Sequence, residues 1–148
     1  METIERILTA STMTLATVGV GGEPHATPLY FVADPDLNLY FYSKATSRHA
    51  RDLESNPFAA VAVYPEVTDW RRILGLQMRG RGSPVEPRWM RQLAWKLYRR
   101  KFPFADAFRM QVVRNRLYVF APTWVRVIDN SQGLGFKKEW TVEKESSL

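Results

Sequence analysis

The sequence predicts a mainly β domain in which about six or seven antiparallel strands, mostly joined by hairpins, close into a small barrel with flanking helices. Three observations lead to this prediction. Short apolar runs are separated by turn residues, they do not alternate with helical stretches, and no glycine-rich dinucleotide fingerprint follows the first strand. The 148 residues are 45% hydrophobic and 24% charged, a composition typical of one soluble globular domain.

The secondary structure follows from hydrophobic spacing and turn residues. Apolar residues recur at helical spacing in residues 2–10, which predicts a short opening helix. Gly21 and Gly22 suit the positive φ angles of a tight hairpin between the first two strands. The expected strands cover residues 13–20, 24–33, 39–42, 58–64, 73–85, 116–121 and 124–129. Pro122 separates the last two strands of this series.

A proline interrupts the second expected strand. His25, Thr27 and Leu29 share one face of this strand, because successive side chains alternate between faces. Pro28 cannot donate a hydrogen bond to a neighbouring strand. The strand is therefore expected to form an edge, a bulge or the floor of a ligand site at Pro28.

Residues 43–57, SKATSRHARDLESNP, place hydroxyl groups and cations where a short helix begins. Thr46 or Ser47 can cap this helix, whose first amides then point outward at the positive end of the helix dipole. The stretch also carries four basic side chains, Lys44, Arg48, His49 and Arg51. Together these features predict an anion site suited to a phosphate group. The alternative is an ordinary capped surface helix.

Residues 73–85 form a long extended segment with two different faces. Gln77, Arg79 and Arg81 lie on one face, opposite leucine and methionine side chains. A polar side chain in such a row needs a bonding partner, so Gln77 is a candidate binding residue.

The net charge of +6 is partly concentrated on a predicted amphipathic helix over residues 88–101. Trp89, Leu93 and Leu97 follow its apolar face with Met90, Ala94 and Tyr98 beside them, and basic residues follow the other face. We interpret the basic face as solvated, with no nucleic acid or membrane as partner. A surface for nucleic acid or an acidic membrane is the alternative.

Several classes of site are excluded by composition. The chain has no cysteine, which excludes thiolate nucleophiles and zinc-thiolate sites, and its only histidines, His25 and His49, argue against a metal site. No apolar run approaches the length of a membrane span, and the N-terminus is acidic where a signal peptide is cationic. We therefore expect a cytoplasmic protein.

The order of four segments resembles the flavin-binding split β-barrels of the pyridoxamine 5'-phosphate oxidase-like family. The segments are TLATVGVGGEPHATPLYFV, LYFYSKATSRHARDLESNPFAAVAV, LQMRGRG and YVFAPTWVRVIDNSQGLGF. The resemblance implies an antiparallel split barrel that binds FMN within residues 1–140. Because the end of the chain is polar and punctuated by glycine, we expect a disordered tail at residues 141–148.

The resemblance also implies which residues bind FMN. The phosphate would be held by Ser43, Ser47, Arg48 and His49 with Lys44 as an outer contact, and the ring by the backbone of Thr27, Pro28 and Leu29 and by Gln77. Relatives often have lysine in place of His49, and a neutral imidazole predicts weaker binding or binding that strengthens at acidic pH. The alternatives are a plain strand residue for Thr27 and a barrel-rim residue for Gln77.

By the same resemblance the protein is expected to be a homodimer with its flavin sites at the subunit interface. Trp70, Trp124, Arg126 and residues 133–138 are candidates for the contribution of the partner chain. The tryptophan, tyrosine and phenylalanine content exceeds what a small barrel readily buries, which agrees with an interface.

Three functions remain open at this point. The first is an FMN-dependent oxidoreductase acting on a small molecule, and the second is a reductase of the same fold that uses the deazaflavin coenzyme F420. The third is a non-enzymatic binder or sensor of a flavin or another phosphorylated ligand. True pyridoxamine phosphate oxidases hold their substrate with an R-x-H pair near the C-terminus, where this chain has VRVIDNS. We therefore expect no oxidation of pyridoxamine phosphate.

Overall fold

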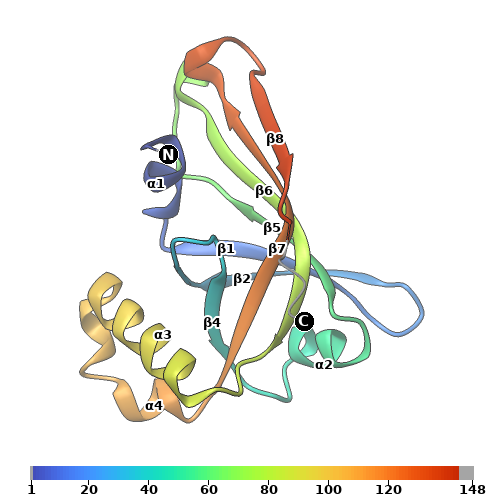
Figure 1. Cartoon of the computed structure of the whole chain (residues 1–148), viewed down its shortest axis with the longest axis vertical. Helices are drawn as coiled ribbons and strands as arrows, with labels where there is room; N and C mark the ends of the chain where they lie inside the picture. The colour runs from blue at the N-terminus through green and yellow to red at the C-terminus, as the bar shows by residue number, and fades with distance from the viewer. Residues whose placement is uncertain (1, 144–148) are drawn as a thin grey trace.

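A computed structural model describes residues 2–143 of the protein as one curled antiparallel sheet with flanking helices (Figure 1). The strands are β1 (Thr12–Val18), β2 (Pro24–Tyr30), β3 (Val32–Ala33), β4 (Leu39–Ser43), β5 (Phe58–Val63), β6 (Leu74–Pro84), β7 (Arg116–Asp129) and β8 (Lys137–Thr141). The helices are α1 (Glu2–Leu8), α2 (Arg48–Ser55), α3 (Arg88–Lys101) and α4 (Arg109–Val113), with short 3-10 turns η1 (Trp70–Arg72), η2 (Pro103–Ala105) and η3 (Asn130–Gln132). The predicted mainly β fold is confirmed. None of the helices in this part of the chain is long and apolar enough to cross a membrane.

The chain itself bridges the two ends of the sheet. The strand order is β2-β1-β5-β6-β7-β4-β3, so β2 and β3 lie at opposite ends although only Phe31 separates them in the sequence. β3 pairs with β4, whereas within residues 2–143 no ladder joins β2 to β4. The two strands nevertheless contact each other. We call the opening between the free edge of β2 and β4 the seam.

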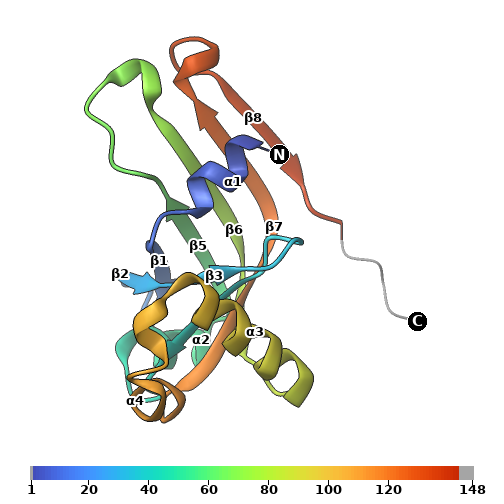
Figure 2. The ribbon, with the colours of Figure 1, turned by 90° about the vertical axis from the view of Figure 1, so that its left-hand side faces the viewer.

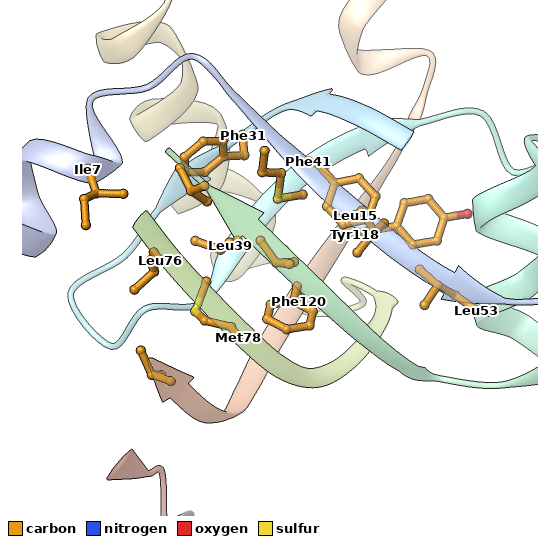
Figure 3. Close-up of a cluster of buried hydrophobic side chains, with 14 of the residues drawn as sticks. Ile7, Leu15, Phe31, Leu39, Phe41, Leu53, Leu76, Met78, Tyr118 and Phe120 are labelled. Carbon is orange, nitrogen blue, oxygen red and sulfur yellow. The ribbon is translucent and has the colours of Figure 1, made fainter. Parts of the chain in front are cut away.

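The core fills the concave side of this sheet. Along β6 the buried side chains of Leu74, Leu76 and Met78 alternate with the outward positions of Gly75 and Gln77, as predicted. Figure 3 shows the aromatic part of this core, with Phe31, Phe41 and Phe120 fully enclosed. Burial of each such side chain stabilises the fold by roughly 1.5–3 kcal/mol.

Helices close the two ends of the barrel. α1 contacts β6 and places the buried Ile7 in the core, while α2 contacts β1, β2 and β6 and contributes Leu53. Figure 3 shows Ile7 and Leu53 on opposite sides of the same cluster. Because α2 contacts β2, its first turn lies near the seam.

The prediction of two closing strands split by Pro122 is wrong. β7 is continuous from Arg116 to Asp129, and its pairing with β6 shifts where Pro122 faces Gly80. Thr123 is the extra residue of a β-bulge, a position where a proline without an amide hydrogen is tolerated. A Cβ on Gly80 would lie 2.1 Å from the carbonyl oxygen of Ala121, so only glycine fits opposite the bulge.

β8 is a strand that the sequence analysis did not predict. Apart from the partly buried Trp140, its residues are polar and exposed, and the strand exists because it pairs with Trp124–Ile128 of β7. Thr141 ends β8, and the amide of Val142 donates to the carbonyl of Thr123, so the expected tail does not begin at residue 141. The remainder of that expectation, residues 144–148, lies outside the described part of the chain.

The amphipathic helix is confirmed as α3, and it buries one side of its predicted apolar face. Ala94 and Tyr98 are its buried residues, whereas Trp89 is 64% and Leu93 is 38% exposed. The face that packs is offset from the Trp89–Leu93 stripe because α3 covers a second, small cluster on the outer side of β4 with Tyr40. Figure 2 shows α3 beside the end of the barrel rather than across the sheet.

Candidate functional site

The start of α2 lies next to the seam and is built from the residues that the sequence analysis singled out. Ser47 is the N-cap, with extended backbone angles and a side chain that accepts a hydrogen bond from the amide of Ala50 at 3.3 Å. The hydroxyl and amide of Ser47 both donate to the carbonyl of Lys44. This turn fixes the loop between β4 and α2.

His49 links the helix to the end of β4. Its Nε2 lies 2.6 Å from the hydroxyl of Ser43 and 3.3 Å from that of Ser47. Burial lowers the pKa of His49 from its usual 6.5, the neighbouring His25 adds to this shift, and Asp52 opposes it. The imidazole is therefore neutral at pH 7 and offers a hydrogen bond instead of a charge.

Arg48 is held in place by Asp52, which is itself bonded to Thr17. Its Nε donates to Oδ1 of the buried Asp52 at 3.2 Å, and the other carboxylate oxygen of Asp52 accepts from the hydroxyl of Thr17 at 2.8 Å. Nη2 of Arg48 lies 3.4 Å from Glu23, a pair exposed enough to contribute little free energy. With 46% of its side chain exposed, Arg48 can turn its Nη groups to an anion while Asp52 keeps Nε.

Gly19 makes room for this arrangement. A Cβ at Gly19 would lie 3.0 Å from Oδ1 of Asp52 and 3.1 Å from Nη2 of Arg48. The sequence analysis missed Gly19, Thr17 and Asp52. The available signal was the spacing of Arg48 and Asp52, which places them four residues apart on one helix face.

The β2 residues line the same seam. Pro28 lies on an edge strand, paired with Thr14 on one side only, which agrees with the edge predicted for it. Thr27 and Leu29 point toward the concave side, and the Oγ1 of Thr27 is buried without a hydrogen-bond partner. An orphaned hydroxyl of this kind costs free energy unless a ligand or water satisfies it.

Gln77 lies apart from the other candidate residues. Pro28, Thr14, Ala62 and Gln77 pair in succession across β2, β1, β5 and β6, so they form one row on the outer face of the sheet. Three strand spacings separate Pro28 from Gln77, which is roughly 14 Å. A ligand at the seam therefore cannot reach Gln77 of the same chain along the free edge of β2.

The arrangement can bind an anion. The first-turn amides of α2, the hydroxyls of Ser43 and Ser47, the Nη groups of Arg48 and the exposed Lys44 are donors around one loop. Within residues 2–143, no group of three histidine or acidic side chains is placed to hold a metal ion.

Comparison with known proteins places the chain in a family. The family model described as pyridoxamine 5'-phosphate oxidase matches residues 2–129. A curated relative, the pyridoxine/pyridoxamine 5'-phosphate oxidase of Xanthomonas oryzae pv. oryzae, is 39% identical over 78 residues, which cover 51% of this chain and 37% of that protein. The chain thus spans little more than a third of the length of this relative.

Solved structures share the fold at low sequence identity. A heme-binding protein from Mycobacterium smegmatis superposes with a TM-score of 0.73 at 20% identity, covering 92% of this chain and 55% of that one. The heme storage protein HutZ from Vibrio cholerae superposes with a TM-score of 0.68 at 21% identity, covering 80% of this chain and 87% of that one. At these identities the likeness concerns the fold alone. From the match over residues 2–129, the chain belongs to the pyridoxamine 5'-phosphate oxidase family.

Proposed function

We propose that the protein is an FMN-binding flavoprotein that exchanges hydride or electrons with a small molecule. The observation that carries this proposal is the position of the anion-binding turn, Ser43 to His49, beside the free edge of β2 with its unpartnered Thr27 hydroxyl. The turn suits the phosphate group of FMN, and the free strand edge suits its planar, polar ring. Membership of the family supports the same cofactor.

The phosphate of FMN would lie at the start of α2. A phosphate monoester is mostly dianionic at neutral pH, so it needs several donors and at least one cation. Arg48 supplies the fixed charge, because Asp52 and Thr17 hold its Nε side, and Lys44 adds a second charge. Ser43, Ser47 and the neutral His49 supply hydrogen bonds.

The ring would lie along the free edge of β2. Backbone groups alternate between the two sides of a strand, and because the amide of Phe31 and the carbonyl of Glu23 bond the β1 side, those of Thr27 and Leu29 face β1 as well. The backbone groups of Ala26, Pro28 and Tyr30 face the free side and can bond the polar edge of a flavin. Pro28 has no amide hydrogen, so at this position the free edge offers only a carbonyl group. When bound, a flavin supplies the hydride and electron transfer, while these residues bind and orient it.

The proposal includes a homodimer in which Gln77 reaches the flavin of the partner. Gln77 is too far from β2 of its own chain, yet it projects from the outer face of the sheet. Phe58, on the same face of β5, and Trp70, in the β5–β6 loop, are 58% and 55% exposed. Apolar side chains gathered on one face are typical of a surface that another subunit covers.

The substrate is proposed to differ from pyridoxamine phosphate. Arg126, within the VRVIDNS segment that replaces R-x-H, is bonded to Glu139 and stacked on Trp124 with its guanidinium 4.9 Å from the ring centroid. The guanidinium of Arg126 is therefore already bound by residues of its own chain and is not free to hold a substrate phosphate.

Titration of the purified protein with FMN, haemin and F420 tests this function. FMN is predicted to bind saturably at one molecule per chain, with quenched flavin fluorescence and a perturbed visible spectrum. Haemin is included because two proteins of the same fold are named for haem. Saturable binding of haemin or F420 with no binding of FMN would reject the FMN proposal.

A further inference from the structure

A groove of about 650 Å³ opens on the outer face of the sheet beside Gln77. Tyr64 and Ile73, at the two ends of the β5–β6 loop, line one side of it together with residues 65–67. Ile128 of β7 forms the other wall, and Gly75 of β6 forms the floor. The volume is in the range of small-molecule sites in proteins.

The floor of the groove is a glycine that the fold does not require. Gly75 lies inside β6, where glycine weakens a strand and often marks the close approach of a ligand. A Cβ at Gly75 would meet only Ile128, at 3.9 Å, which is ordinary contact. At Gly80 and Gly82 of the same strand, by contrast, a Cβ would lie within 3 Å of Ala121 or Leu53. The missing side chain at Gly75 therefore leaves space in the groove that the packing of the sheet does not require.

The charge of the groove selects against anions. Glu66 is the one acidic or basic side chain in its lining among the described residues. Arg126, which faces Gln77 across the strands, is already paired with Glu139. A phosphate or sulfonate would find no counter-ion there and would face a carboxylate. The amide of Gln77 at one end can donate to or accept from a carbonyl group.

We propose that this groove binds the second substrate, an uncharged planar molecule of the aromatic or quinone class, in contact with Gly75. The proposal rests on the proposed function, because Gln77 brings the groove next to the flavin of the partner subunit. A flat apolar ligand fits between Ile128 and the β5–β6 loop, and its carbonyl oxygen can bond Gln77. The groove thereby distinguishes this protein from an enzyme that acts on a phosphorylated amine.

The test compares 1,4-naphthoquinone with 1,4-naphthoquinone-2-sulfonate by equilibrium dialysis against the whole chain, with and without FMN. The neutral quinone is expected to bind saturably at one molecule per chain, and the sulfonate at least roughly tenfold more weakly, since the groove would remove its charge from water without supplying a counter-ion. Equal affinity for both compounds, or no saturable binding of the quinone, would overturn the proposal.

Two variants locate the binding. Gly75→Ala and Gly75→Val fill the floor in steps and should weaken quinone binding progressively, by at least roughly tenfold for Val, since a well-fitted site does not accept added methyl groups. Ala60→Val, which adds bulk to the same face of β5 outside the groove, is the matched control and should bind the quinone normally. Unchanged quinone binding by Gly75→Val would contradict the assignment. FMN affinity, measured in the same samples, reports separately on the proposed function, and thermal unfolding confirms that each variant is folded.

Discussion

The hydroxyl of Thr17 donates to the buried carboxylate of Asp52 at 2.8 Å, and this contact joins β1 to α2 behind the candidate anion site. The second oxygen of Asp52 holds Nε of Arg48. A guanidinium held at one nitrogen loses less freedom when its other nitrogens bind an anion, so Thr17 and Asp52 act as positioning residues.

Removal of this support should cost stability as well as affinity. Thr17→Val leaves a buried carboxylate with one partner fewer and should lower the free energy of unfolding by about 1–3 kcal/mol. Glu23→Gln removes only an exposed contact of Arg48 and should change the free energy of unfolding by less than about 0.5 kcal/mol. Urea unfolding of both variants measures the difference, and equal effects would show that Asp52 is not held as described.

Arg48 should account for much of the FMN affinity. Arg48→Ala removes a charged hydrogen-bond donor worth about 1.5–3 kcal/mol, which corresponds to roughly 10- to 150-fold weaker binding. Arg51→Ala removes an exposed arginine from the same helix and serves as the matched control, with an expected change below about twofold. Fluorescence titration gives both affinities, and similar losses in the two variants would indicate only a general effect of charge.

Stability should depend on pH through His49. Its pKa in the folded protein lies below the unfolded value of 6.5, so the unfolded chain binds more protons in acid. The free energy of unfolding is therefore expected to be highest above pH 6.5 and to fall as the pH decreases through the lowered pKa of His49. Urea unfolding at a series of pH values measures this decrease. His49→Gln should reduce it, and an identical pH profile in that variant would exclude His49 as its source.

Complementation between subunits tests which subunit supplies the Gln77 that contacts each flavin. Arg48→Ala and Gln77→Leu should each weaken FMN binding as homodimers. If Arg48 of one subunit and Gln77 of the other share a flavin, a mixed dimer contains one site with both native residues and one site with neither. Mixing the two variants should then restore tight binding to about half of the sites in mixed dimers. Absence of recovery in verified mixed dimers would place both residues in the same chain's site.

The sequence predicted features that depend on neighbours along the chain. The alternation of Leu74, Leu76 and Met78 against Gln77 follows from the period of a strand, and the cap at Ser47 follows from its hydroxyl before a helix. Pro28 on an edge strand follows from its missing amide hydrogen. Such rules need no knowledge of the rest of the fold.

Features that depend on pairing between distant segments were missed. β8 is polar and becomes a strand only because β7 offers it an edge. The bulge at Thr123 requires the facing Gly80, and the contact of Thr17 with Asp52 joins residues 35 positions apart. The position of Gln77 in the row of Pro28 depends on the register of three ladders, which a single sequence does not reveal.

A comparison of FMN with riboflavin tests the central claim most directly. The two molecules share the ring and the ribityl chain, and only FMN carries the phosphate assigned to Ser43, Ser47 and Arg48. We predict that fluorescence titration will give FMN an affinity at least roughly 100-fold higher, the effect of two charge-assisted hydrogen bonds. Equal affinities for FMN and riboflavin would contradict the assignment of the α2 turn as the phosphate site.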